Sequence, residues 1–452
     1  MGFFSKIFGS KENKEQEVQP VENKTVPVEE KPVEKPVEEP AKEEVETPAE
    51  EPQQKIVAEE PKSAEPKTAS SNNAGQVDLS KWRIAPNGED GTPEFQQGAD
   101  GTQQMQVLLK CDMGDEESLT DDRRKALVEQ VFKGPEGVKL FGQDTLIENI
   151  FLISYMQNVM VPKAHEANNQ NDLAVFSNLI GLYSRMFVAK ITRLEKWVAI
   201  GSQVTGFPFE MGKMALVLVQ DKYADEMVDI MSNQQNYKVG KNEIAHEHFS
   251  HFADFLRRCG YAGIAISDGR HPGVAIPLDL FFTGENEPKI GQMENPLLMG
   301  AMISFMQEIR RGIDVNTMPA EEQEGYKQVL SRMQGQMFYQ IANADFVVPT
   351  KKDEQGRELN PSFQNPEGTE RMLAVFTDVQ EMDGAFPMRD GWISIPTPFD
   401  RIVDMINSNN GAGFVINSAS ISVPVPKDMM NHIAQMKASE EESKKKNEET
   451  QN

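Results

Sequence analysis

The chain has 452 residues and carries 46 Lys and Arg against 71 Asp and Glu, which gives a formal net charge of −25. A length of this order predicts about two to four domains. Because phosphate must be neutralised by Lys and Arg, so acidic a chain is not expected to bind nucleic acid. Its two cysteines, Cys111 and Cys259, form neither a disulfide framework nor a zinc ribbon, and so few cysteines fit a reducing compartment.

In the first residues, MGFFSKIFGS, the spacing of three phenylalanines and Ile7 would put them on one face of a short helix. This amphipathic segment, 1–11, predicts weak peripheral membrane contact through residues 1–10. A frayed terminus, or a helix docked on the protein itself, is the alternative. The sequence predicts no signal peptide and no membrane-spanning helix, because its longest apolar stretch, 146–161, is short and contains polar residues.

Residues 12–77 are rich in Glu, Pro and Lys and contain no aromatic residue. Residues 1–77 hold ten lysines and seventeen glutamates, a net charge of −7, which leaves −18 for the rest of the chain. Such a composition cannot bury enough apolar area to offset the ordering entropy, so it predicts a disordered spacer. The charged tail, 433–452, is expected to be solvated in the same way.

Residues 78–143 read as a poorly defined N-terminal extension. The run MQVLLKC (105–111) predicts a strand, and Ser118 or Thr120 is placed to cap a helix through ALVEQVF.

The main signal is an internal repeat. The residues 152–159, 214–219, 249–267 and 274–279 recur in the same order as 302–309, 372–377, 399–417 and 423–428. The preserved order predicts a duplicated domain, with copies at 144–285 and 294–432.

Both copies predict the same elements in the same order. Helices over 144–160 and 171–184 match those over 294–310 and 320–336, and strands near 187–190 and 346–349 follow. Then come a charge-free strand (214–219 or 372–377), an amphipathic helix, a strand opened by Gly263 or Gly413, and a short strand ending in proline. The sequence thus predicts an α/β or α+β fold. It consists of two tandem related domains, each a small sheet with covering helices, preceded by the disordered acidic Pro-rich segment.

The second copy resembles the N-terminal domain of the SseB (enhanced serine sensitivity) family. The matching stretches are FVVPT (346–350), RMLAVFTDVQEM (371–382), the helix from Phe399, and GAGFVINSASISVPVP (411–426). Ser418 stands where the family often has Pro. The resemblance reaches the first copy only through the repeat, where Ser267 and Asp268 replace the Asn-Pro pair. It implies a small α/β domain of cytoplasmic bacterial proteins and brings no catalytic residue with it.

Two patterns suggest a reactive or metal-binding site. His246, His248 and His251 are the best metal candidate, although the second copy has Pro396, Pro398 and Arg401 there, and an exposed helix start is the alternative. Ser267 in AISDG is weakly similar to a nucleophile elbow but lacks its first glycine. The methionines at helical spacing, Met299, Met302 and Met306, are typical of core, with a partner groove as the alternative.

These observations favour a non-catalytic protein-interaction or adaptor protein, held at the inner face of the cytoplasmic membrane through its N-terminus. No catalytic, cofactor-binding or metal-binding residue is assigned, no cofactor is expected, and neither the protein partner nor the oligomeric state can be named. One alternative is a metal-dependent enzyme with a site around His246, His248 and His251. The other is a structural or secretion-associated membrane accessory protein.

Overall fold

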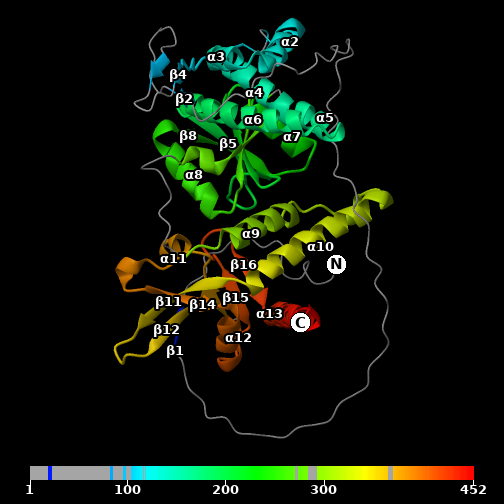
Figure 1. Cartoon of the computed structure of the whole chain (residues 1–452). Coiled ribbons are helices and arrows are strands. Elements are labelled where there is room, and N and C mark those ends of the chain that lie inside the picture. Colours follow the sequence, from blue (N-terminus) through cyan, green and yellow to red (C-terminus); the bar gives the residue numbers. More distant parts are fainter. Residues whose placement is uncertain are drawn as a thin grey trace. The chain divides into compact units, whose positions relative to one another are not determined.

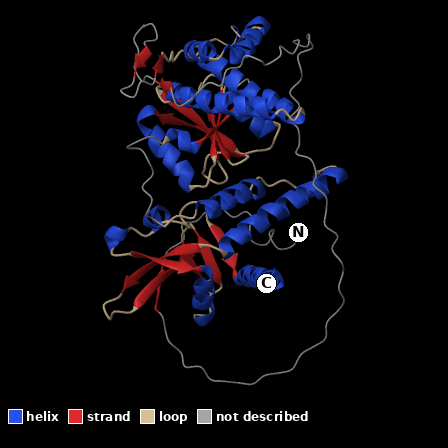
Figure 2. Ribbon diagram, viewed as in Figure 1, coloured by secondary structure: helices blue, strands red, loops and turns tan. Residues whose placement is uncertain are grey.

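The computed structural model describes residues 19–22, 82–84, 95–97, 103–115, 117, 119–269, 273–282, 293–364 and 370–451. They form an α+β fold with two sheet-containing domains, as predicted (Figure 2). The amphipathic segment 1–11 lies outside the described residues. Of the predicted spacer, only β1 (Gln19–Glu22) is described, and it is a strand. No helix in the described part of the chain is long and apolar enough to cross a membrane.

A small sheet and a helical layer precede the first domain. The sheet has the order β2 (Trp82–Ile84), β4 (Gln103–Val107), β3 (Phe95–Gln97). The predicted cap of the next helix is Thr120, whose hydroxyl accepts from the backbone N–H of Arg123 at the start of α2 (Asp121–Gln130). A short 3-10 turn, η3 (Val131–Lys133), leads into α3 (Pro135–Gln143).

The predicted helix over 144–160 is present, whereas the predicted strand near 187–190 is wrong. The chain forms α4 (Leu146–Tyr155), the short π-helix η4 (Met156–Met160), α5 (Val161–Glu166) and α6 (Gln170–Ile191). The apolar run at 187–190 lies in α6, where Met186, Phe187 and Ile191 are buried on one helical face. Burial at 3.6-residue spacing therefore outweighs the β-propensity of a short apolar run.

The first sheet has the order β10-β9-β7-β5-β8, with the short β6 against β7. Its strands and the helices between them are β5 (Lys196–Ser202), β6 (Glu210–Met211), β7 (Met214–Leu218), α7 (Ala224–Asn233), β8 (Val239–Ala245), η5 (His246–His248), α8 (Phe249–Arg258), β9 (Gly263–Ser267), β10 (Val274–Pro277) and η6 (Leu278–Phe281). Strands β7 and β9 are parallel, and the other pairs are antiparallel. Alternate β5 residues face opposite sides, so Val198 and Ile200 pack toward α7 while Trp197 faces α8.

The second sheet has the order β14-β11-β12-β13-β15-β16, with β1 paired to β12 (Figure 1). Its domain consists of α9 (Pro296–Ile309), η8 (Val315–Thr317), α10 (Ala320–Ala342), β11 (Asp345–Lys352), β12 (Glu358–Gln364), β13 (Arg371–Val375), α11 (Val379–Ala385), η9 (Met388–Asp390), β14 (Ile393–Pro398), α12 (Phe399–Ser408), β15 (Gly413–Ile416), β16 (Val423–Pro426) and α13 (Lys427–Gln451). Met382 of α11 packs on one face of the sheet, whereas Phe399 and Ile402 of α12 pack on the other. The charged tail continues α13, and its residues up to 447 are mostly exposed.

The two glycines singled out in the sequence occupy corresponding places. Gly263 pairs with Met214 and Pro277, and Gly413 pairs with Met372 and Pro426. A Cβ at Gly263 would lie 2.3 Å from the carbonyl oxygen of Ile276, and at Gly413, where φ is +140°, it would lie 2.2 Å from that of Val425. Close strand approach therefore requires glycine at both positions.

Candidate functional site

The residues that the sequence suggests for a metal site or a nucleophile do not form a reactive site in the described part of the chain. His246 and His248 lie on η5 and His251 in the first turn of α8, all three exposed. The described part of the chain contains no group of three His, Cys, Asp or Glu side chains placed to hold a metal. Ser267 ends β9, is buried, and accepts a hydrogen bond from the backbone N–H of Gly269 at 3.0 Å. The strand that follows, β10, pairs back on β9, whereas a nucleophile elbow would continue into a helix.

The methionine stripe is core, as its spacing predicts. Met299, Met302 and Met306 of α9 are each no more than 1% exposed. Trp197 is also buried and stacks on Phe249 with ring centroids 3.8 Å apart.

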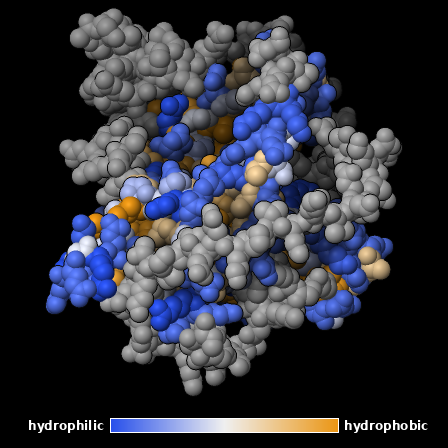
Figure 3. All heavy atoms as spheres, turned by 90° about the horizontal axis from the view of Figure 1, so that it is seen from below, coloured by the Kyte–Doolittle hydropathy of each residue, from blue (hydrophilic) through white to orange (hydrophobic). Residues whose placement is uncertain are grey.

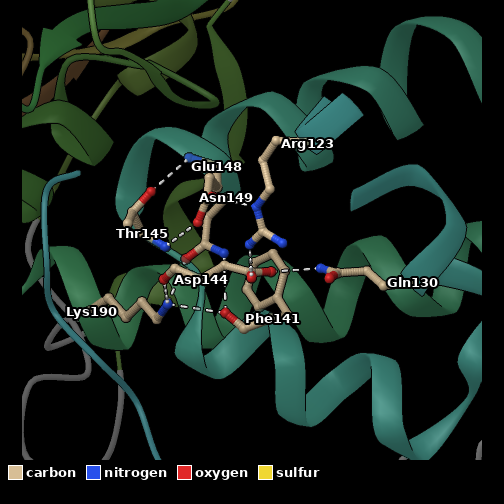
Figure 4. Close-up of polar contacts among 8 residues, drawn as sticks. All are labelled: Arg123, Gln130, Phe141, Asp144, Thr145, Glu148, Asn149 and Lys190. Atoms are coloured by element: carbon tan, nitrogen blue, oxygen red, sulfur yellow. Dashed lines mark hydrogen bonds and ion pairs between the residues drawn. The ribbon is translucent and has the colours of Figure 1, made fainter. Parts of the chain in front are cut away.

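Lys190 of α6 is a fully buried charged group that lies against the end of α3 (Figure 4). Its Nζ donates to the carbonyl oxygens of Phe141 at 3.0 Å and Asp144 at 2.7 Å, and to Oδ1 of Asn149 at 2.7 Å. An ammonium has three protons, so all of them have acceptors. The carbonyls at a helix C-terminus have no partner within the helix, and Lys190 bonds one of them, that of Phe141 in the last turn of α3.

A second layer of charges surrounds this lysine. Arg123 of α2 donates from Nη2 to Asp144 at 2.8 Å and from Nε to Glu148 at 2.6 Å. Gln130 donates to the other Asp144 carboxylate oxygen at 2.6 Å. Glu148 in turn accepts from the backbone N–H of Thr145 at 2.8 Å and completes a capping box at the start of α4. The network therefore ties α2, α3, α4 and α6 together (Figure 4).

Burial sets the charge balance of this network. It lowers the pKa of Lys190 to about 8, against the attraction of the Asp144 carboxylate. It also raises the pKa of Asp144, more than Gln130 and Arg123 lower it. Glu148 is likewise desolvated, but the hydrogen bonds from Arg123 and Thr145 hold its pKa below the usual value. The hydrogen bond to Glu148 raises the pKa of Arg123.

This network is built to hold the helices in place. Every Lys190 proton is directed at the chain's own backbone or at Asn149, so a substrate would have to break those bonds to reach the amine. Sequence reasoning missed the network because it assigned 187–190 to a strand. Two signals could have found it: the pattern Thr145-x-x-Glu148, which is a capping box, and a single lysine within an apolar run.

A second polar cluster lies where the parallel strands β13 and β15 end. Asn417 is fully buried in the left-handed region, with φ at 49°. Its Oδ1 accepts from the backbone N–H of Thr377 at 2.9 Å, and its Nδ2 donates to Thr377 Oγ1 at 2.8 Å. The carbonyl of Asn417 also accepts from the N–H groups of Ser420 and Ser422. The cluster therefore fixes the turn between β15 and β16.

The same cluster starts α11. Asp378 caps this helix by accepting from the backbone N–H of Glu381 at 2.9 Å. Burial raises the pKa of Glu381, whose carboxylate accepts a hydrogen bond from the hydroxyl of Ser420. The side chains of Asp378, Glu381 and Ser420 therefore form hydrogen bonds within the domain.

The third feature is the edge of β12, which carries an added strand. Leu359 of β12 pairs with Lys351 of β11 on one side and with Glu22 of β1 on the other. Ser362 lies in the same way between Leu373 of β13 and Gln19 of β1. β11 thus pairs with the first two residues of β12 and β13 with its last three, along the same edge, and β1 occupies the opposite edge.

A groove adjoins this edge. Its volume is about 410 Å³, and it is lined by Asn360, Ser362, Glu370, Arg371, Leu373, Met405, Ile406 and residues 409–413. The groove thus runs from β12 across β13 to the C-terminal end of α12, and its lining mixes charged, amide and apolar side chains.

Comparison with known proteins finds one family model that matches part of the chain. The family model described as SseB protein N-terminal domain matches residues 327–432, which span α10 to the start of α13. The matched region holds the Asn417 cluster, β12 and the groove, whereas the Lys190 network lies outside it. No curated protein and no solved structure matches the chain.

Proposed function

We propose that this chain is a non-catalytic protein-interaction protein, an adaptor built from an SseB domain at 294–432 and a divergent copy of it at 144–285. The observation that carries the proposal is the β12 edge of the SseB domain, which already holds a separate segment of the chain as an added strand beside a groove. Backbone pairing at a sheet edge is a common way for a protein to bind an extended segment.

The strand orders support the duplication. The first sheet, β10-β9-β7-β5-β8, corresponds strand for strand to β16, β15, β13, β11 and β14. The central parallel pairs have matching registers, with Met214 opposite Gly263 and Met372 opposite Gly413. Helices α8 and α12 each follow the outer strand and begin at a phenylalanine. The family model matches the second domain alone, so the first is proposed as a copy on topology and on the sequence repeat.

The two domains differ where the added strand binds. In the first domain the strand before β7 is β6, which has two residues. In the second domain the strand before β13 is β12, which has seven. Interaction through β12 is therefore a property that we assign to the second domain.

The surface supports a polar mode of binding. On the face drawn in Figure 3, the described residues are mostly hydrophilic, and hydrophobic residues form small separate areas. A partner that binds through main-chain hydrogen bonds does not need a large apolar patch. The perturbed groups Lys190, Asp144 and Asn417 are bound within the fold, which favours interaction over catalysis as the role of the chain.

We place the protein at the inner face of the cytoplasmic membrane, through weak contact of residues 1–10. The motivation is the sequence alone, in which Phe3, Phe4 and Phe8 would share a face with Ile7 if these residues formed a helix. The acidic spacer repels anionic lipids and keeps this contact reversible.

One experiment tests the adaptor role and the membrane contact together. Tagged full-length chain is recovered from its native cells after separation of membrane and soluble fractions, and co-purifying proteins are quantified. Residues 1–77 with the same tag serve as control for proteins that bind the acidic segment. We expect a partner in near-stoichiometric amount with the full chain and none with the control. The double variant Phe3→Asp, Phe4→Asp should keep the partner and lose several-fold of its share in the membrane fraction.

Two results would count against these proposals. A full-length chain that captures nothing beyond the control contradicts the adaptor role. An unchanged membrane share in the double variant contradicts the placement of residues 1–10 at the membrane, and leaves the adaptor role intact.

A further inference from the structure

The two edges of β12 differ in which backbone groups they present. The hairpin that joins β11 to β12 is closed by a hydrogen bond from the backbone N–H of Asp353 to the carbonyl of Arg357 at 3.0 Å. In an antiparallel pair, hydrogen-bonded and non-hydrogen-bonded positions alternate, so Leu359 directs its backbone groups toward Lys351. Asn360 and Ser362 then direct their N–H and C=O groups toward the opposite edge. That edge is the one on which β1 lies.

The register of β1 fits this alternation. Val21 lies opposite Asn360 and Gln19 opposite Ser362, which are the positions that exchange hydrogen bonds. Pro20 lies opposite Pro361, at the position between them that needs no N–H from either strand. Two prolines, which cannot donate, are thus accommodated without the loss of a ladder bond.

Pro20 also disfavours the pairing of a further strand with the outer edge of β1. Its backbone groups face away from β12, where a further strand would need an N–H that proline lacks. An edge closed by proline does not template further pairing, which is how natural sheets avoid association at their edges. A segment with proline between two hydrogen-bonding residues can therefore pair with β12, but no further strand can pair with that segment in turn.

The groove also allows the side chains of a segment bound at this edge to be recognised. Asn360 and Ser362, the residues opposite Val21 and Gln19, both line it. Successive residues of a strand point to opposite faces, so every second residue of an added segment lies on the face of the groove. Its volume of about 410 Å³ suits a few side chains rather than a folded domain.

We propose that the outer edge of β12 is a binding site for an extended segment of the type X-Pro-Val-Glu, and that Gln19–Glu22 is its occupant in this chain. This deepens the proposed function and rests on it for the biological meaning of the site: a partner with such a segment binds by replacing β1. The sequence Pro-Val-Glu recurs in the chain at 27–29, 32–34 and 36–38.

The test compares two sets of proline substitutions in the full-length chain. The test variant removes the N–H that faces β12, in every copy so that none takes the place of another: Val21→Pro, Val28→Pro, Val33→Pro and Val37→Pro. The matched control places proline one residue later, where no ladder bond is needed: Glu22→Pro, Glu29→Pro, Glu34→Pro and Glu38→Pro. The readout is amide hydrogen exchange at Asn360 and Ser362, at high ionic strength so that the lost charges matter little.

We expect exchange at Asn360 and Ser362 to be about tenfold faster in the valine variant than in the wild type, because the loss of one ladder bond weakens the added strand by about that factor. The glutamate variant should exchange within about twofold of the wild type, because its ladder bonds are intact. Equal exchange in the wild type and the valine variant would overturn the occupancy of the edge by β1. Equal acceleration in both variants would overturn the register.

A peptide completes the test. The synthetic peptide QEVQPVENKT, residues 16–25, is added at millimolar concentration to the valine variant, and the same peptide with Val21→Pro is the control. The first should restore slow exchange at Asn360 and Ser362 and the second should not. Failure of both peptides would overturn a site open to partners. Because these measurements use purified protein, they are independent of whether a partner is captured from cells.

Discussion

Replacement of Lys190 by Met should lower the free energy of unfolding of the first domain by about 2–4 kcal/mol. The substitution fills the space of the aliphatic chain but leaves the carbonyl of Asp144 and Oδ1 of Asn149 without their donor in a buried place. It also removes one of the two cations, Lys190 and Arg123, that offset the Asp144 carboxylate. Chemical denaturation followed by circular dichroism measures the change.

The matched control is Lys163→Met on α5. Lys163 is exposed, so its replacement should change stability by less than about 0.5 kcal/mol. If Lys190→Met is as mild as this control, the network does not hold the helices together.

The pH dependence gives this prediction a specific signature. The pKa of Lys190 is about 8 in the folded chain against 10.5 in the unfolded one. Between these values the unfolded chain binds more protons, so stability rises with pH in this window. The difference in unfolding free energy between the wild type and Lys190→Met should therefore grow from pH 8 toward pH 10. A difference that is flat over this range would contradict the lowered pKa.

Replacement of Asn417 by Leu should destabilise the second domain by about 3–5 kcal/mol. Three causes add together: the buried backbone N–H of Thr377 loses its acceptor, the hydroxyl of Thr377 and the sulfur of Met299 lose the amide donor, and leucine is strained in the left-handed region. Asn417→Gly keeps the backbone conformation and should lose less. Thermal and chemical denaturation of the full chain report both.

Asn410→Leu is the control for backbone strain. Asn410 has a similar left-handed backbone, with φ at 51°, but it is exposed. Its replacement should cost about 1 kcal/mol, the price of the conformation alone. If the two leucine variants are equally stable, the hydrogen bonds of the buried asparagine contribute nothing.

The elements that the sequence predicts well are those with one clear period. The central strands β7 and β13 and the amphipathic helices α8 and α12 lie where the pattern places them, although β13 begins one residue early, at the exposed Arg371. The positions of Gly263 and Gly413 are also predicted correctly, since each glycine begins a strand that follows a helix.

The candidate sites are harder to predict from the sequence. The Lys190 network joins residues from four helices, and no local pattern shows that Arg123, Asp144 and Lys190 meet. The strand β1 could not be predicted because its proline and its acidic surroundings are typical of an unstructured segment. Its pairing depends on the backbone that β12 presents, which is a tertiary property.

We propose that two copies of one fold lie in this chain, one of which has gained the seven-residue strand β12. A crystal structure of the full chain tests it most directly, by superposition of residues 196–282 on 345–432. We expect β10, β9, β7, β5 and β8 to superpose on β16, β15, β13, β11 and β14, with Gly263 on Gly413 and with β12 as an insertion between β13 and β11. A first sheet with a different strand order, or with β7 and β9 antiparallel, would contradict it.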